Sequence, residues 1–210
     1  LRALVTSPAY DNNLFAAGIS RRDWEALRTR NPDISAWVSV EGTPIDYPVV
    51  SPREGDPQGF YLNHDFDRNW SFAGCPYLDP RGTADGRHAL VYGHHLNFDS
   101  EMFTYLRNAW RQEKFDTLGD MYWSTPDGGT MRLHPAFSLS VDKSFAGIQR
   151  FDLTGAAETR TWLADLSAQA SARADGCDDL CAHATRAVTL VTCTGNFAGG
   201  RARTLTVFVG

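Results

Sequence analysis

Short runs in which apolar and polar residues alternate dominate this chain, and they predict β-strands. The first is AWVSVEG, which begins at Ala36, and a Gly-Thr-Pro turn separates it from the run IDYPVV. Further short runs are expected to be extended, although not all of them alternate and ALVYGH is mostly apolar: FYLNHDF from Phe60, CPYLDP from Cys75, ALVYGH from Ala89, MYWST from Met121, MRLHPAFSLSV from Met131, AVTLVTC from Ala187 and RTLTVFVG from Arg203. The pattern predicts a chain made mostly of short strands.

Three stretches have the composition or periodicity of helices. Residues 21–30 follow Ser20, which can serve as the N-cap, and they end before Pro32, because the residue preceding a proline disfavours helical geometry. A short helix is expected over residues 99–110, and the longest over residues 156–174. Strands and helices do not alternate regularly, which argues against a doubly wound sheet. We therefore expect a mostly β fold with peripheral helices, built as a closed and largely antiparallel β-barrel.

Length and charge narrow the class of protein. The chain has 210 residues, which suits a single domain spanning residues 1–210, with residues 1–19 as a loose lead-in. The formal net charge of −5 and the absence of a Lys/Arg run argue against a nucleic-acid partner. No apolar run is long enough to span a membrane. Because the chain begins at Leu1 rather than Met, we expect that a natural N-terminal membrane anchor has been removed.

The chain contains four cysteines, and two of them form the motif CDDLC. Cys177 and Cys181 are spaced to meet on one helical turn, and His183 follows closely. A metal site there would have only three nearby ligands, so a local disulfide or two unpaired thiols are the alternatives. Cys75 lies between apolar residues in AGCPYLD and is expected to be buried and inert.

The fourth cysteine is the candidate nucleophile. Cys193 ends a β-branched run and shares a strand face with Val191, so it can present its sulfur to a groove, although a small buried side chain is the alternative. A thiol reacts as its thiolate, which a nearby base or cation favours. Residues 194–200 form a glycine-rich loop that can bring Arg201 or Arg203 back beside the sulfur. Arginine stays protonated and can stabilise an oxyanion.

Two of the six histidines are candidates for the base. His94 and His95 follow an apolar strand and a glycine in LVYGHH, a position that projects from a strand end. The other four are expected at the surface. A cysteine, a histidine and an arginine together make a thiol site for acyl transfer, with a nucleophile, an acid/base and an oxyanion stabiliser.

These motifs resemble those of the sortases, specifically class B. The signature TLxTC stands here as Thr189-Leu190-Val191-Thr192-Cys193, and the histidine motif YGH stands as Tyr92-Gly93-His94. The run MFxxL at residues 102–106, the stretch NPDISAWVSVEGTPIDYPVV, FYLNHDF and the long helix before the last two strands also match. The resemblance extends from about Asp23 to the end of the chain.

The resemblance implies a closed eight-stranded sortase barrel and a role for each site residue. By position, Cys193 is the nucleophile, His94 is the acid/base and Arg203 stabilises the oxyanion, with Arg201 as the alternative arginine. It further suggests a substrate groove and an oxyanion donor in the backbone N–H of Thr194. The groove residues are expected to be Tyr92, Asn63, Val191, Thr194 and Arg201. Val191 departs from the family, which usually has Ser there, so the usual class B substrate motif is in doubt.

The resemblance also implies an activity and a location. It implies a cysteine transpeptidase that cleaves the C-terminal sorting signal of a secreted protein after Thr. The acyl group would pass through a thioacyl-enzyme to an amine of a peptidoglycan precursor or a pilin lysine, with no metal or cofactor. The place of action would be the extracellular face of the cytoplasmic membrane of a Gram-positive cell. A thiol hydrolase that uses water as acceptor, and a non-catalytic binding barrel, are the alternatives.

Overall fold

The structure is a computed structural model that describes residues 5–6, 21–96, 100–127, 129–194 and 200–210. Most of the expected lead-in, residues 1–19, lies outside the described residues. Its described part is β1 (Val5–Thr6), which pairs with β2 (Arg21–Arg22). In the described part of the chain, no helix has the length and apolar character needed to cross a membrane.

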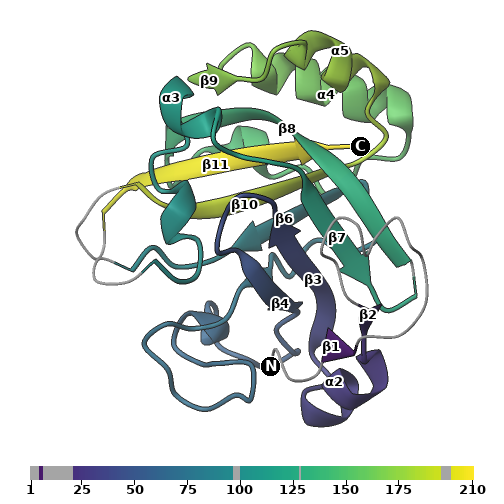
Figure 1. The fold of residues 1–210 in the computed structure, drawn as a ribbon, viewed down its shortest axis with the longest axis vertical. Helices are drawn as coiled ribbons and strands as arrows, with labels where there is room; N and C mark the ends of the chain where they lie inside the picture. The colour runs from purple at the N-terminus through teal and green to yellow at the C-terminus, as the bar shows by residue number, and fades with distance from the viewer. Residues whose placement is uncertain (1–4, 7–20, 97–99, 128, 195–199) are drawn as a thin grey trace.

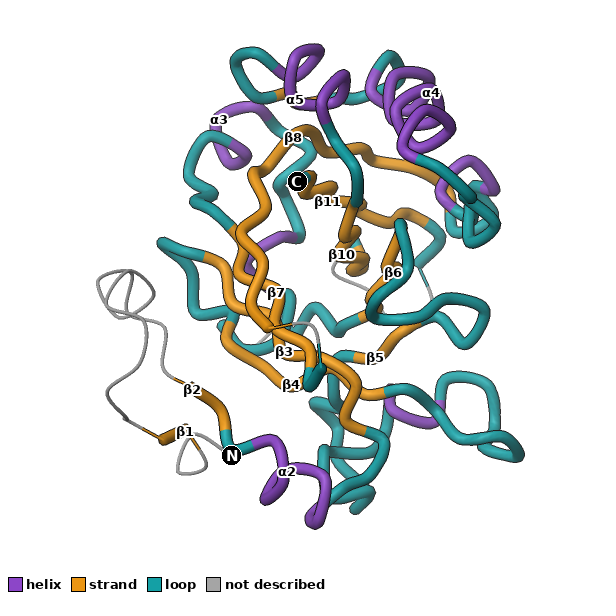
Figure 2. The backbone as a smooth tube through the Cα atoms, turned by 90° about the vertical axis from the view of Figure 1, so that its right-hand side faces the viewer, coloured by secondary structure: helices purple, strands orange, loops and turns teal. Residues whose placement is uncertain are grey.

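Eight strands form a closed barrel, as expected. In barrel order they are β11 (Ala202–Val209), β10 (Ala187–Cys193), β6 (His88–Tyr92), β5 (Tyr77–Leu78), β4 (Asp46–Val50), β3 (Ile34–Val40), β7 (Met121–Thr125) and β8 (Gly129–Asp142). Pairing of β8 with β11 closes the ring (Figures 1 and 2). A short extra strand, β9 (Ala172–Arg173), pairs with β8. Neighbouring strands are antiparallel except for β4–β5 and β6–β10, which are parallel.

Alternation along the strands creates two apolar faces. On β10, Val188 and Leu190 belong to the core inside the barrel, whereas Ala187 and Val191 belong to a second core on its outer side. Helices α4 (Ala156–Ser167) and α5 (Cys177–His183) lie together over this outer side, next to β8 (Figures 1 and 2). The outer face of β6, β10 and β11 is therefore buried where the helices cover it and reaches the surface at the strand ends.

The first helix begins later than the sequence pattern predicts. It is α2 (Trp24–Arg30), and Asp23 rather than Ser20 caps it, because the Asp23 carboxylate accepts a hydrogen bond from the Ala26 N–H at 2.9 Å. The two residues before Asp23 form β2 instead. The helix ends at Arg30, and Asn31 is its C-cap in front of the proline, as predicted.

Two other expectations are wrong. The run from Phe60 is a 3₁₀ turn, η2 (Phe60–Leu62), because the rings of Phe60 and His64 stack 3.8 Å apart, a contact that an extended strand would not allow. Of the described residues 100–110, only η3 (Thr104–Leu106) is helical, and Met102 has a positive φ of 54° that breaks a regular helix.

The long helix is also shorter than predicted. It ends at Ser167, and the N–H groups of Ser171 and Ala174 donate to carbonyls of β8, so this part of the chain joins the sheet as β9. The short helix α3 (Gln112–Phe115) and the 3₁₀ turn η4 (Ala146–Ile148) were not predicted.

Candidate active site

Two adjacent parallel strands bring the predicted cysteine and histidine to one edge of the barrel. Val191 of β10 is in register with Tyr92 of β6, and the Gly93 N–H donates to the Val191 carbonyl at 3.0 Å. Cys193 and His94 each lie two residues beyond this registered pair. Because side chains alternate along a strand, both continue the face that Val191 and Tyr92 occupy. The parallel pairing therefore places thiol and imidazole at neighbouring strand exits.

The register also distinguishes the two candidate arginines. Cys193 and Arg203 are directly opposite each other on β10 and β11, and the next pair, Thr194 and Ala202, is joined by an N–H to carbonyl bond of 3.1 Å. Hydrogen-bonded and non-hydrogen-bonded pairs alternate, so Cys193 and Arg203 form a non-hydrogen-bonded pair, whose side chains approach most closely. Arg201 instead forms an ion pair of 2.6 Å with Asp142 at the surface. Arg203 is thus the arginine beside the cysteine.

A backbone carbonyl fixes the orientation of His94. Its Nε2 lies 2.8 Å from the carbonyl oxygen of Leu62 in η2. A carbonyl only accepts hydrogen bonds, so Nε2 carries a proton, and in the neutral ring the basic nitrogen is Nδ1. Gly74 packs against this carbonyl with φ +66°, and a Cβ there would lie 2.7 Å from the Leu62 oxygen. The neighbouring His95 has a different contact, since its Nε2 accepts from Arg107 at 3.1 Å.

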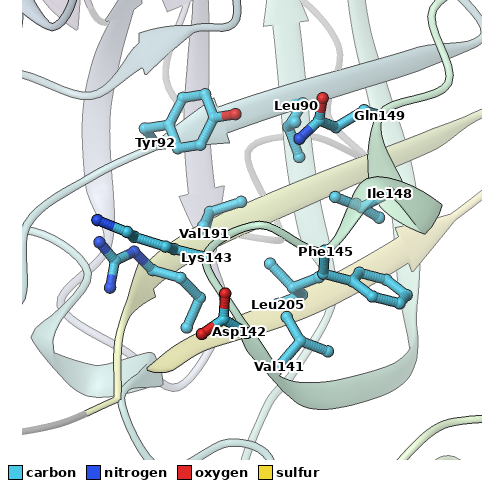
Figure 3. Close-up of a pocket in the computed structure, with 11 residues that line it drawn as sticks. Leu90, Tyr92, Val141, Asp142, Lys143, Phe145, Ile148, Gln149, Val191 and Leu205 are labelled. Carbon is cyan, nitrogen blue, oxygen red and sulfur yellow. The ribbon is translucent and has the colours of Figure 1, made fainter. Parts of the chain in front are cut away.

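A groove leads away from these residues along the outer face (Figure 3). Its floor consists of Leu90, Val191 and Leu205 from three neighbouring strands, and Phe145 and Ile148 form a wall. Tyr92, Val141, Asp142, Lys143, Gln149 and Arg203 complete the lining. Val191 is 4% exposed and contributes only methyl groups to the floor. Because Arg203 lines the groove and faces Cys193 across the strands, the groove ends beside the thiol.

A buried carboxylate holds the tyrosine of the groove. The Tyr92 hydroxyl donates to Asp79 at 2.9 Å, and Arg81 forms an ion pair with the same carboxylate at 2.7 Å. Burial opposes ionisation of Asp79, but its bonds with Arg81 outweigh that effect and hold its pKa below the usual value. Burial raises the pKa of Tyr92, so the phenol stays protonated and acts as a hydrogen-bond donor.

Other predicted groove residues are less directly placed. Thr194 uses its N–H for the Ala202 carbonyl, and its hydroxyl lies 2.9 Å from that of Thr204, so in this structure the expected oxyanion donor is already engaged. Asn63 is exposed and caps η2, one residue after the carbonyl that contacts His94. Residues 195–199 of the predicted glycine-rich loop lie outside the described residues.

Three residues of this region were missed in the sequence. Tyr77 pairs with Tyr92 across β5 and β6 with ring centroids 5.4 Å apart, and burial raises its pKa to about 12. Asp79 follows β5 in YLDP, and Lys143 follows β8 in VDKSF. A charged residue directly after a strand is the signal that could have identified the last two.

The remaining cysteines are free thiols. Cys75 is buried, as expected, and burial raises its pKa. Cys177 and Cys181 are both buried on α5 and their thiols interact, but they form no disulfide. His183, the third candidate metal ligand, contacts Asp179 instead. Among the residues that the structure describes, no group of three or more His, Cys, Asp and Glu side chains could hold a metal ion.

Known proteins resemble this chain in sequence and in fold. It is 32% identical over 98 residues to sortase B of Staphylococcus aureus and 30% identical over 108 residues to sortase B of Listeria monocytogenes. These segments cover 46% and 50% of this chain but only 38% and 42% of the relatives. The X-ray structure of Clostridium perfringens sortase B matches with a TM-score of 0.75 and 25% identity, over 89% of this chain and 98% of that one. No family model matches the sequence.

The closed barrel, with a cysteine and a histidine at adjacent parallel strand exits, has the fold of the sortases. The two sequence relatives and the matching fold are those of sortase B, so the chain resembles the class B sortases in both sequence and fold.

Proposed function

We propose that this chain is a cysteine transpeptidase that cleaves a C-terminal sorting signal after threonine and transfers the acyl group to an amine. One observation carries the proposal: Cys193 faces Arg203 across two strands, next to the exit that carries His94, where the groove ends. A nucleophile, an acid/base and a fixed cation at one position are the requirements of acyl transfer through a thioester.

In the first step, the Cys193 thiolate attacks the carbonyl carbon of the substrate threonine. Negative charge develops on the carbonyl oxygen. The Arg203 guanidinium, which in the free protein donates to the carbonyls of Gly200 and Ala202, supplies N–H donors to that oxygen. His94 protonates the departing amine from Nδ1, since Nε2 is held by the Leu62 carbonyl. The C–N bond breaks and a thioacyl-enzyme remains.

In the second step, an incoming amine loses a proton to His94 and attacks the thioester carbonyl. The tetrahedral intermediate collapses, the C–S bond breaks and Cys193 is released as the thiolate. The acceptor is an amine of a peptidoglycan precursor or a pilin lysine, at the outer surface of a Gram-positive cell. With water as acceptor, the same residues would make a thiol hydrolase.

Related structures support a peptide substrate and an amine acceptor. A Staphylococcus aureus sortase B–substrate complex has this fold with a TM-score of 0.71 and 23% identity, and a sortase B complexed with triglycine has it with 0.71 and 22%. Triglycine carries a free amine at the end of a peptide. In the present chain, the groove along β6, β10 and β11 is the place where an extended donor peptide would lie.

The test is incubation with a library of fluorogenic sorting-signal peptides, with and without triglycine, followed by mass spectrometry of the products. We expect cleavage after threonine, with triglycine joined to the new C-terminus, and no reaction of Cys193→Ala. Cleavage that never incorporates the amine would identify a hydrolase. Unchanged turnover by Cys193→Ala would show that the nucleophile is another residue.

A further inference from the structure

We propose that the groove binds a carboxylate of the donor peptide, and that Lys143 is the residue that selects an acidic side chain near the cleaved bond. This inference rests on the proposed function and adds a substrate class to it. The groove has an apolar floor, but charged side chains line one end of it.

The backbone holds Lys143 at the groove. Its N–H donates to the Arg201 carbonyl at 2.7 Å, which continues the pairing of β8 with β11 beyond Asp142. In that pairing Val141 is the cross-strand partner of Arg203, the arginine beside the thiol. Lys143 follows Val141 by two residues along the chain. Figure 3 shows the Lys143 side chain directed away from Phe145 and Ile148, the apolar wall of the groove. The ammonium group thus belongs to the polar end of the groove.

The cations of the groove have no counter-charge among the described residues. Lys143 is exposed and takes part in no ion pair with any residue that the structure describes. The guanidinium of Arg203 donates to two backbone carbonyls and to no described carboxylate. Asp142 is the acid in the lining, and its charge is engaged by Ser144 and Arg201, which hold its pKa well below the usual value.

Lysine is rare in this chain, and acidic residues outnumber basic ones. The chain carries 25 acidic and 20 basic residues, and only two of the basic residues are lysines, Lys114 and Lys143. Elsewhere on the surface, arginines pair with aspartates, as Arg132 does with Asp120. An uncompensated lysine beside Arg203 creates a local positive potential in an otherwise acidic protein, which attracts an anionic ligand.

The floor determines the rest of the ligand. Leu90, Val191 and Leu205 offer apolar contact, and their side chains carry no hydrogen-bond donor or acceptor. Selectivity here therefore depends on shape and charge rather than on a hydroxyl. The ligand that fits both parts of the groove is an extended peptide with an apolar residue over the floor and an aspartate or glutamate facing Lys143.

The experiment compares matched peptides that differ only by Glu or Gln at each position flanking the threonine. Acylation is measured without acceptor as kcat/KM, and binding is measured by fluorescence anisotropy with the Cys193→Ala protein, which reports the groove without turnover. We expect one position at which Glu is preferred about two- to fivefold, the range of an exposed ion pair, and at which added salt weakens the preference.

Three variants test the residue. Lys143→Gln should abolish the preference, and Lys143→Glu should favour a Lys peptide at that position. Lys114→Gln changes the only other lysine, which lies against the ring of Tyr105 outside the groove, and should keep the preference.

The outcomes separate this inference from the proposed reaction. Equal binding and acylation of all Glu and Gln pairs by the wild type would overturn the inference while leaving the transpeptidase intact. Selective binding without cleavage of any peptide would instead retain the carboxylate site and contradict the proposed reaction.

Discussion

His88 makes the stability of this protein depend on pH in a way that can be calculated. The sequence analysis expected His88 at the surface, and that expectation is wrong. The ring is buried between β6, β10 and α4, where it packs against Trp162 with ring centroids 4.6 Å apart. Its Nδ1 donates to the Arg150 carbonyl at 3.0 Å, so Nε2 accepts from the Thr189 hydroxyl, also at 3.0 Å. Both ring nitrogens are therefore satisfied only in the neutral form.

Burial lowers the pKa of His88 from 6.5 to about 4, against smaller opposing effects of the Arg150 carbonyl and Asp79. In the unfolded chain the ring protonates near pH 6.5, whereas in the folded protein it stays neutral until the pH approaches 4. Between these two pH values the unfolded chain binds a proton at His88 and the folded protein does not, so acid stabilises the unfolded state. The contribution of His88 is fully present above pH 6.5 and is lost as the pH falls to 4, by about 2 kcal/mol at pH 5 and about 3 kcal/mol at pH 4.

The assay is urea unfolding at about pH 7 and about pH 5 for the wild type and for His88→Asn, whose amide can still donate to the Arg150 carbonyl. Other groups that titrate between these pH values are common to both proteins, so the difference between the two proteins isolates the histidine. The wild type should lose about 2 kcal/mol more than the variant between these pH values. His183→Asn, which removes an exposed imidazole from α5, is the control. Equal losses in the wild type and His88→Asn would refute the reasoning.

Three further predictions concern the site and the core beside it. Gly74→Ala should lower kcat and shift the pH dependence of acylation, because its Cβ would displace the Leu62 carbonyl that orients the imidazole, and an unchanged profile would contradict this role. Arg203→Ala should reduce kcat by about 10²–10³ with little change in KM, whereas Arg201→Ala should retain most activity; the reverse order would reassign the arginine. Iodoacetamide should leave Cys75 unmodified in the native protein, as burial raises its pKa, and early labelling detected by peptide mapping would show that this core opens.

The barrel could be predicted well from the sequence, because successive side chains of a strand point to opposite faces and the pattern of apolar and polar residues follows them. The prediction failed where local contacts override that pattern. The run from Phe60 is a candidate for a short extended segment by sequence, but the Phe60–His64 stack and a left-handed Gly59 turn it into η2. Around Met102, apolar spacing resembles a helix, yet the backbone turns through positive φ there.

For the candidate site as well, some residues could be predicted from motifs, whereas other features depended on the fold. Motifs suggested Cys193 and His94 as candidates, and the family resemblance favoured Arg203 over Arg201. The register of β10 and β11, which places Arg203 opposite Cys193, is specified by no local sequence pattern. The role of the Leu62 carbonyl could not be predicted either, because backbone groups have no sequence signal. Lys143 was missed for a related reason, since its position in the groove depends on the pairing of β8 with β11.

The central claim is that Cys193 forms a thioester with the donor peptide. Intact-protein mass spectrometry after rapid acid quenching, with a cleaved peptide and no amine acceptor, tests it most directly. We expect the protein mass to increase by that of the peptide up to its threonine, with the adduct on Cys193, released by hydroxylamine and lost on addition of triglycine. Product formation with no adduct at any quench time in the wild type, or an adduct that persists in Cys193→Ala, would contradict the account.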